Sequence, residues 1–277
     1  MTRSNPREFS LAALTVLELT PPEMVECAAE SGYDYVGLRL LPATDQEVRH
    51  DIVGNTPLTR ATQARLRDTG VKVLDIEIVR LKPGTNVADY RPMLETGAEL
   101  GARYVLVAGN DPDETRMAER LAQLCDFAKP LGLSPSLEPM PWTEVKDITQ
   151  GARVVKAAGR DNAGLVVDPI HFDRAASSTE ELAALPREYF GYLQFCDAPA
   201  ERPADLDTLL FQARCERMIP GEGGIDLAGI LRALPGHLPL SIEVPTQQWA
   251  KSASAVERAR KLREASLTVL ARTYAAR

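Results

Sequence analysis

The sequence predicts an α/β fold in which residues 1–277 form one domain, a single (β/α)8 TIM barrel. Short β-rich runs alternate with helical patterns along the whole chain, as in folds built from parallel βα units. Eight such units can be counted, and 277 residues is about the length that one eight-unit barrel uses. No Pro- or Gly-rich linker separates the units, so a closed barrel is the expected architecture.

The predicted strands are short and apolar. Residues 104–107 and 165–167 are apolar throughout rather than alternating, which is typical of parallel strands covered on both faces. The eight predicted strands are residues 9–16, 33–40, 71–81, 103–108, 133–139, 163–168, 189–197 and 238–244. An open doubly wound sheet would usually carry a phosphate-binding glycine fingerprint after its first strand, and residues 11–20 contain no glycine.

The predicted helices follow the strands in turn. They are residues 21–31, 58–69, 87–100, 114–129, 144–158, 179–185, 227–234 and 255–277. Glycine follows five of these runs, where a left-handed residue ends a helix at little cost: Gly32, Gly70, Gly101, Gly132 and Gly159. The least regular stretches, residues 41–57 and 197–224, are expected to be long loops that form a pocket wall or a lid.

Composition limits the classes of function. Thirty-two Lys and Arg against 39 Asp and Glu leave a net charge of −7, which disfavours nucleic acid and anionic membranes as partners. No run approaches the roughly 18 to 20 apolar residues of a bilayer span, and residues 1–7 lead into no signal-type run, so a cytoplasmic protein is expected. The four cysteines include no CxxC pair and are expected to be reduced and structural.

Polar residues close four of the apolar strands, all in the second half of the chain: Glu138, Asp168, Gln194 and Glu243. Catalytic groups of such barrels lie where the strands end. Three carboxylates that converge there repel one another unless a cation compensates them. This oxygen-rich set suits one divalent metal ion, manganese or magnesium, better than it suits zinc or copper. Each acidic residue alone has a plainer interpretation, the N-cap of a helix.

Further residues are candidates for substrate binding. His171 lies three residues after Asp168, and an imidazole there binds substrate or relays a proton, unless it is a structural histidine. Arg217 lies in the long loop 197–224, where a guanidinium recognises a carboxylate, a phosphate or a hydroxyl. Weaker candidates are Arg39, Glu77, Arg80, Arg214 and Trp142, each of which also has a packing or salt-bridge interpretation. His50 and His237 are expected to be solvent-exposed.

These motifs resemble the xylose isomerase-like barrels, which include sugar and sugar-phosphate epimerases, inosose isomerases and dehydratases, dehydroshikimate dehydratases and, more remotely, endonuclease IV. The resemblance rests on Leu137-Glu138-Pro139, Asp168-Pro169-Ile170-His171, the Pro220-to-Asp226 turn and Ile242-Glu243-Val244-Pro245. It implies a metal ion held by Glu138, Asp168, Gln194 and Glu243, with manganese or magnesium first and cobalt or zinc as alternatives. It also implies that His171 and Arg217 face the substrate and, by analogy alone, a homo-oligomer.

Gln194 departs from the family pattern. The resemblance implies that many epimerases of the family have a histidine here, in a His-x-x-Asp stretch, where this chain reads Gln194-Phe195-Cys196-Asp197. Some relatives that resemble dehydroshikimate dehydratases have Gln at this place. An amide oxygen still binds a hard metal but adds no capacity for proton transfer. The endonuclease branch is disfavoured because the chain has only three histidines and an acidic net charge.

The main functional hypothesis is a metal-dependent isomerase or epimerase of a small sugar, polyol ketone or sugar phosphate. The metal would stabilise an enediolate while Glu138 and Glu243 move a proton on opposite faces of the substrate. The alternative is a dehydratase of the dehydroshikimate or inosose type, in which a β-hydroxyl leaves with help from an acid such as His171. A barrel that binds a polyol or keto acid without turning it over is the third hypothesis.

Overall fold

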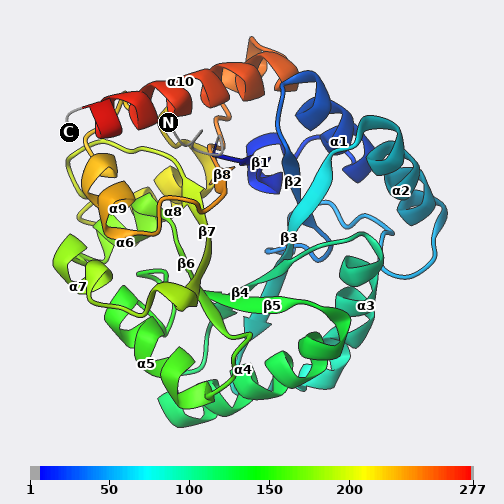
Figure 1. The fold of residues 1–277 in the computed structure, drawn as a ribbon, viewed down its shortest axis with the longest axis vertical. Coiled ribbons are helices and arrows are strands. Elements are labelled where there is room, and N and C mark those ends of the chain that lie inside the picture. Colours follow the sequence, from blue (N-terminus) through cyan, green and yellow to red (C-terminus); the bar gives the residue numbers. More distant parts are fainter. Residues whose placement is uncertain (1–6, 276–277) are drawn as a thin grey trace, which may run out of the picture.

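The computed structural model describes residues 7–275, and its eight strands close into one parallel barrel in chain order (Figure 1). The predicted fold class is therefore confirmed. The strands are β1 (Phe9–Leu11), β2 (Tyr35–Arg39), β3 (Lys72–Leu81), β4 (Tyr104–Gly109), β5 (Ser134–Glu138), β6 (Gly164–Val167), β7 (Phe190–Phe195) and β8 (Leu240–Ile242). β1 pairs with both β2 and β8, which closes the cylinder.

The helices form a ring outside the barrel (Figure 1). They are α1 (Pro21–Glu30), α2 (Pro57–Thr69), α3 (Arg91–Glu99), α4 (Glu114–Ala128), α5 (Ile148–Ala158), α6 (Pro169–Arg174), α7 (Thr179–Ala183), α8 (Leu206–Cys215), α9 (Leu227–Ala233) and α10 (Ala255–Ala275). Short 3-10 turns are η1 (Ala13–Val16), η2 (Val87–Tyr90), η3 (Lys129–Leu131), η4 (Arg187–Tyr189) and η5 (Trp249–Lys251). All five glycines predicted to end helices have a positive φ.

The prediction of a strand over residues 9–16 is wrong beyond Leu11, because Ala13–Val16 forms the turn η1. The hydroxyl of Thr15 donates to the carbonyl of Ile242 at 2.8 Å and accepts from the amide of Val244 at 2.9 Å. These bonds tie the turn to the end of β8. The carbonyl of Ile242 and the amide of Val244 are therefore hydrogen-bonded by the Thr15 side chain, and a longer first strand is not needed to satisfy them.

Loop 197–224 contains a helix that the sequence analysis missed, α8, whose N-cap Asp205 accepts from the amide of Thr208. The predicted helix 144–158 begins late, at Ile148, because the Asp147 side chain caps it through the amide of Gln150. Residues 276–277 of the last predicted helix lie outside the described residues.

β3 carries extra residues relative to both of its neighbours. Val36 and Leu38 of β2 pair with Val73 and Ile76, so two residues of β2 span three of β3, and a second irregularity faces β4. Such bulges re-aim side chains locally. Arg39 pairs in register with Glu77 of β3, so both side chains are presented at the same end of the barrel.

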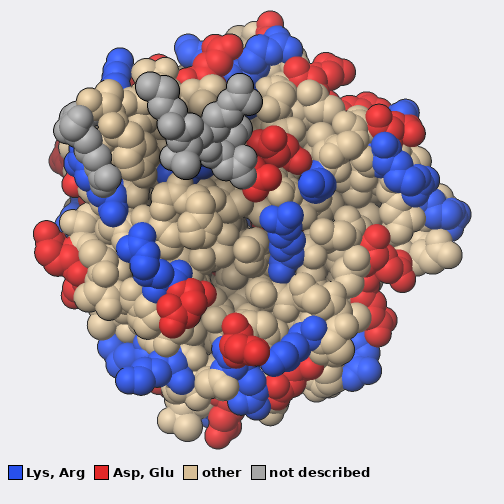
Figure 2. All heavy atoms as spheres, viewed as in Figure 1, with Lys and Arg blue, Asp and Glu red and all other residues tan. Residues whose placement is uncertain are grey.

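The core lies mainly between the sheet and the helix ring, and a smaller apolar cluster lies inside the barrel. Within residues 7–275, no helix combines the length and apolar character of a membrane span. Figure 2 shows acidic and basic side chains interspersed over the face viewed there. That face carries no broad patch of a single sign.

Candidate active site

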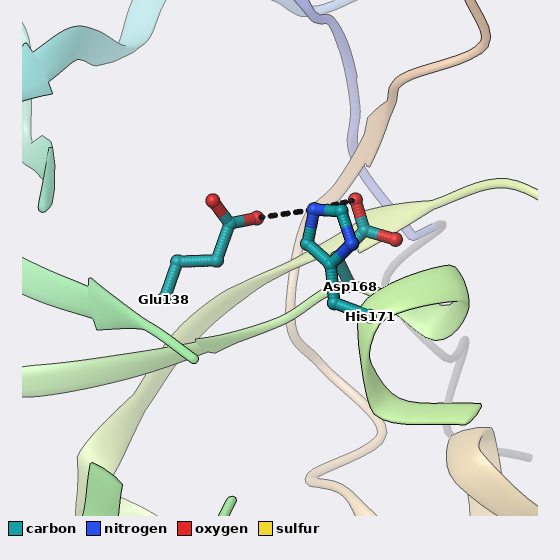
Figure 3. A group of neighbouring side chains, drawn as sticks. All are labelled: Glu138, Asp168 and His171. Atoms are coloured by element: carbon teal, nitrogen blue, oxygen red, sulfur yellow. Dashed lines mark ion pairs between the residues drawn. The ribbon is translucent and has the colours of Figure 1, made fainter. Parts of the chain in front are cut away.

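Three buried side chains converge where β5 and β6 end. Glu138 is the last residue of β5, Asp168 follows β6, and His171 lies on α6 (Figure 3). The Nε2 atom of His171 is 3.7 Å from Oε1 of Glu138 and 3.7 Å from Oδ2 of Asp168. One donor atom from each residue lies within 4.8 Å of the others, which is close enough for one metal ion to contact all three.

The short helix α6 explains how His171 reaches this cluster. Asp168 is its N-cap, because Oδ1 accepts from the amide of Ile170 at 3.0 Å, and Pro169 occupies the first turn. The capping interpretation of Asp168 is therefore correct, yet its Oδ2 faces His171 and Arg217. One carboxylate thus begins the helix with one oxygen and takes part in the cluster with the other.

Arg217 connects two of the predicted site carboxylates. Its Nη1 atom lies 2.7 Å from Oδ2 of Asp168, and its Nη2 atom lies 2.9 Å from Oε2 of Glu243. It also donates to the carbonyls of Ala213 at 2.7 Å and of Glu243 at 3.0 Å. This side chain, which is 2% exposed, is therefore held on several sides, as a buried guanidinium requires.

Gln194 on β7 and Glu243, which directly follows the adjacent strand β8, lie beside the cluster. The amide nitrogen of Gln194 donates to Oε1 of Glu243 at 3.1 Å, while its Oε1 atom is buried without a hydrogen-bond partner. The structure therefore brings Glu138, Asp168, Gln194 and Glu243 to one end of the barrel. Glu243 is turned toward Arg217 and Gln194. The three side chains that lie closest together are therefore Glu138, Asp168 and His171.

Burial and mutual repulsion shift the pKa values of the carboxylates apart. Burial first, then the charges of Glu243 and Asp168, raise the pKa of Glu138 well above its ordinary value. Burial raises the pKa of Glu243 to about 8. Burial acts in the same direction on Asp168, but the Arg217 charge, the His171 charge and the hydrogen bonds from Cys196 and Arg217 together hold the Asp168 pKa below its ordinary value. The single guanidinium therefore does not balance all of these carboxylates.

His171 is neutral at physiological pH. Burial lowers its pKa to about 4, and Arg217 adds to the effect although Asp168 opposes it. The ring is held edge-on to Trp142, with ring centroids 4.7 Å apart and planes at 88°. A neutral imidazole is the form that binds a metal ion or exchanges hydrogen bonds with a hydroxyl.

The residues fit a divalent metal ion. Oε1 of Glu138 and Oε1 of Gln194 are buried oxygen atoms without a hydrogen-bond partner. Atoms of this kind call for a specific explanation, and a bound ion is one. The donors are mainly carboxylate and amide oxygens, which suit a hard cation, and a cation would compensate the repulsion that raises the glutamate pKa values.

A cavity of about 330 Å³ opens in front of these side chains. Its lining includes Glu138, His171, Arg217, Glu243 and Trp142. Loop 41–57 contributes Ala43, Thr44, Gln46 and Glu47 to the lining, as expected of a pocket-wall loop. The volume suits a small polar molecule.

Three more arginines line this cavity, and they differ in their partners. Arg39 is occupied, because its Nε lies 2.9 Å from Glu77 and its Nη1 lies 3.0 Å from Glu47. Within residues 7–275, no carboxylate forms an ion pair with Arg80 or Arg214. Burial, then the charges of Arg214 and Arg39, lower the Arg80 pKa. Two cationic side chains therefore face the cavity without an anionic partner.

Several residues that organise the site were not proposed from the sequence. Glu47 anchors loop 41–57 to Arg39, and it also accepts from the amide of Ala43. Asp197 accepts from the amides of Ala198, Gly221, Gly223 and Ile225, and so fixes the loop that carries Arg217. Asp75 is 1% exposed inside the barrel, close to Gly37. The acidic alternation Asp75-Ile76-Glu77 within an apolar strand was a usable signal.

The remaining sequence expectations concern histidine and cysteine. His237 is exposed as expected, and His50 is half-buried. No disulfide joins the four cysteines, all of which lie in the described part of the chain. Cys196 is not remote from the site, because its Sγ lies 3.3 Å from Oδ1 of Asp168.

Comparison with known proteins gives sequence relatives over most of the chain. Residues 25–266 match the family described as xylose isomerase-like TIM barrel. A 3-dehydroshikimate dehydratase of Pseudomonas aeruginosa is 29% identical over 248 residues, which are 84% of this chain and 37% of that protein. An inosose isomerase of Bacillus velezensis is 26% identical over 223 residues, 76% of this chain and 77% of that protein. The chain thus spans little more than a third of the dehydratase.

Solved structures share the architecture. One described as the IOLI protein with a binding zinc atom has a TM-score of 0.79 and 22% identity, and it covers 96% of this chain and 99% of that chain. At this identity the likeness concerns the fold, and the zinc atom belongs to that protein.

Proposed function

The chain belongs to the xylose isomerase-like TIM barrel family, and from this premise we propose that it is a divalent-metal-dependent enzyme that removes the proton beside the carbonyl of a small polyhydroxylated ketone. The observation that supports the proposal is the buried cluster of Glu138, Asp168 and His171, of which Glu138 and His171 line a ligand-sized cavity. Glu138, Asp168, Gln194 and Glu243 are the proposed metal-binding residues, with His171 next to them. Manganese or magnesium is the proposed ion, with zinc or cobalt as alternatives.

When bound, the metal ion supplies Lewis-acid stabilisation of the negative charge that forms on the ketone oxygen. Glu138, whose buried carboxylate lines the cavity, accepts the proton from carbon. Glu243 directly follows β8, and burial raises its pKa to about 8, a range suited to the exchange of a proton with carbon. Arg217 and Gln194 hold that second glutamate in place.

Within this class we favour a carbon–oxygen lyase that acts on a cyclic hydroxy-keto carboxylate of the 3-dehydroshikimate type. The observation that favours it is the pair Arg80 and Arg214, which line the cavity without a carboxylate partner. A substrate carboxylate supplies the missing anion through charge-assisted hydrogen bonds. After Glu138 takes the proton, the β-hydroxyl departs, and the same proton reaches it through His171, so the substrate loses one water and the enzyme is regenerated.

An isomerase or epimerase of a neutral polyol ketone is the second candidate. It is favoured by the match to the inosose isomerase of Bacillus velezensis, which extends over 77% of that protein, against 37% for the dehydratase. In this reaction Glu138 and Glu243 exchange the proton between the two faces of the substrate. The first proton removal is common to both candidates.

Proton NMR in deuterated water separates the candidates. The manganese-loaded protein is incubated with 3-dehydroshikimate and, separately, with an inosose. A lyase gives an unsaturated product and releases water only from the keto acid, whereas an isomerase exchanges the proton beside the carbonyl and gives an isomer without loss of oxygen. If neither substrate changes and neither exchanges a proton, this proposal is wrong and a binding barrel remains.

A further inference from the structure

A second cavity, of about 500 Å³, lies beside the active-site cavity at the same end of the barrel. We call it the rim cavity. It is built by the residues after β1, by the segment after β8 and by the first turn of α10. Leu14, Leu17, Arg214 and Gln247 line both cavities, so the two adjoin each other.

The rim cavity contains buried hydrogen-bond donors without partners. Arg258 is 1% exposed, and its only recorded side-chain partner is Glu18, while its Nε atom has none. The hydroxyl of Thr246 is also buried without a partner, in a residue that is 8% exposed. A guanidinium has five N–H donors, and leaving buried donors unpaired is costly. Both residues line the same cavity.

The charges of the lining favour an anion. Arg214, Lys251 and Arg258 contribute three positive charges, and Glu18 is the one acidic residue among the lining residues. Glu18 is half-exposed and pairs with Arg258, so Arg214 and Lys251 remain for a ligand. In TIM barrels the segments after strands seven and eight commonly bind phosphate, and the rim cavity lies next to both.

We propose that the rim cavity binds an oxyanion group, a phosphate or carboxylate, that is held by Lys251, Arg214 and Arg258 and by the hydroxyl of Thr246. The group is either the far end of an elongated substrate that passes Arg214 or part of a separate effector. The proposal does not depend on the reaction assigned above, because it concerns binding outside the carboxylate cluster.

Inorganic phosphate is the probe. It is titrated calorimetrically into the full chain at constant ionic strength, with chloride as the replaced anion, and saturable binding is expected. Lys251 is exposed, so Lys251→Met should leave the fold intact and weaken phosphate binding about tenfold, the effect of one charge-assisted hydrogen bond. Thr246→Val should weaken it about threefold by removing one neutral donor.

Lys261→Met is the matched control, because this exposed lysine lies over the Trp249 ring near Lys251 but does not line the rim cavity. It should bind phosphate like the wild type. The proposal fails if phosphate does not bind saturably, or if Lys251→Met and Thr246→Val bind it normally. It also fails if binding is lost in Arg80→Met yet kept in Lys251→Met, since the phosphate then occupies the active-site cavity.

Inhibition of turnover by phosphate shows whether the oxyanion group belongs to the substrate or to a separate effector. Phosphate that competes with the substrate, and competes less well in Lys251→Met, identifies the group as part of the substrate. Phosphate that binds with the same Lys251 dependence but without competition identifies a separate effector. Both results support the rim cavity as an oxyanion site.

Discussion

The guanidinium of Arg217 lies 2.7 Å from the carboxylate of Asp168, and both side chains are almost fully buried. The same guanidinium reaches Glu243, so one positive charge serves two acidic groups. This arrangement leaves the site short of positive charge, which is the condition that a divalent cation would meet.

Arg217→Met should lower the free energy of unfolding by about 3 to 5 kcal/mol, because it leaves two buried carboxylates without their charged partner. Urea denaturation of the metal-free protein measures this loss. Arg153→Met is the matched control, since Arg153 forms an exposed ion pair with Glu114 and should cost less than about 1 kcal/mol. Equal losses in the two variants would contradict the interpretation of Arg217.

Glu243→Gln should retain the fold and abolish turnover. The amide keeps the size of the side chain, but it removes a proposed anionic metal-binding group and, in the isomerase reaction, a proton carrier. General acid–base residues contribute about 10² to 10⁴-fold in rate. Circular dichroism checks the fold, and the NMR assay described above measures turnover. Unchanged turnover would remove Glu243 from the mechanism.

Removing the metal ion should stop turnover without unfolding the chain. The barrel core does not depend on the cluster, so dialysis against a chelator should leave the circular dichroism unchanged. Adding Mn²⁺ at about 100 times its Kd should then stabilise the protein by about 2.7 kcal/mol, measured as a rise in Tm. Glu138→Gln should lose most of this rise, whereas a rise of wild-type size in that variant would place the ion elsewhere.

The sequence could predict the barrel and the carboxylates because both follow from local patterns. Each strand is an apolar run, and Glu138, Asp168 and Glu243 each end such a run, so a parallel barrel necessarily gathers them at one end. His171 follows Asp168 closely enough to share its segment.

Other features depend on contacts between distant segments. Asp197 is recognisable as a loop anchor only after Gly221, Gly223 and Ile225 have folded back onto it. Arg39 was predicted to bind substrate, but its guanidinium donates to Glu77 instead. This pairing depends on the irregular register of β3. An apolar pattern does not reveal where an extra residue enters a strand.

Arg80→Met should raise the KM of a carboxylate substrate about tenfold and change kcat little. The lost hydrogen bond stabilises the bound substrate and the transition state equally. Steady-state kinetics on 3-dehydroshikimate measure the split. Arg120→Met provides a control, since this arginine donates to the carbonyl of Pro83 and does not line the cavity. An unchanged KM in Arg80→Met would disconnect Arg80 from the substrate and weaken the case for an anionic one.

Asp75 gives a pH-dependent prediction for stability. Burial, then the charges of Glu77 and Glu243, raise its pKa well above the ordinary value of 3.8, while Arg39 opposes the shift. Tyr192 also faces it, and its hydroxyl and Oδ1 of Asp75 are both buried without hydrogen-bond partners. The native state therefore keeps a proton on Asp75 under conditions where the unfolded chain has released it.

Well below pH 3.8 both states carry this proton, and Asp75 contributes nothing to the pH dependence. As the pH rises above that value the unfolded state ionises first, so the wild type loses stability by at most about 1.4 kcal/mol per pH unit from this group. Asp75→Asn removes the loss. The free energies of unfolding of variant and wild type, measured in urea from pH 4 to 8, should therefore diverge with rising pH in favour of the variant. Parallel curves, or a divergence in favour of the wild type, would show that Asp75 is ionised and paired in the native barrel.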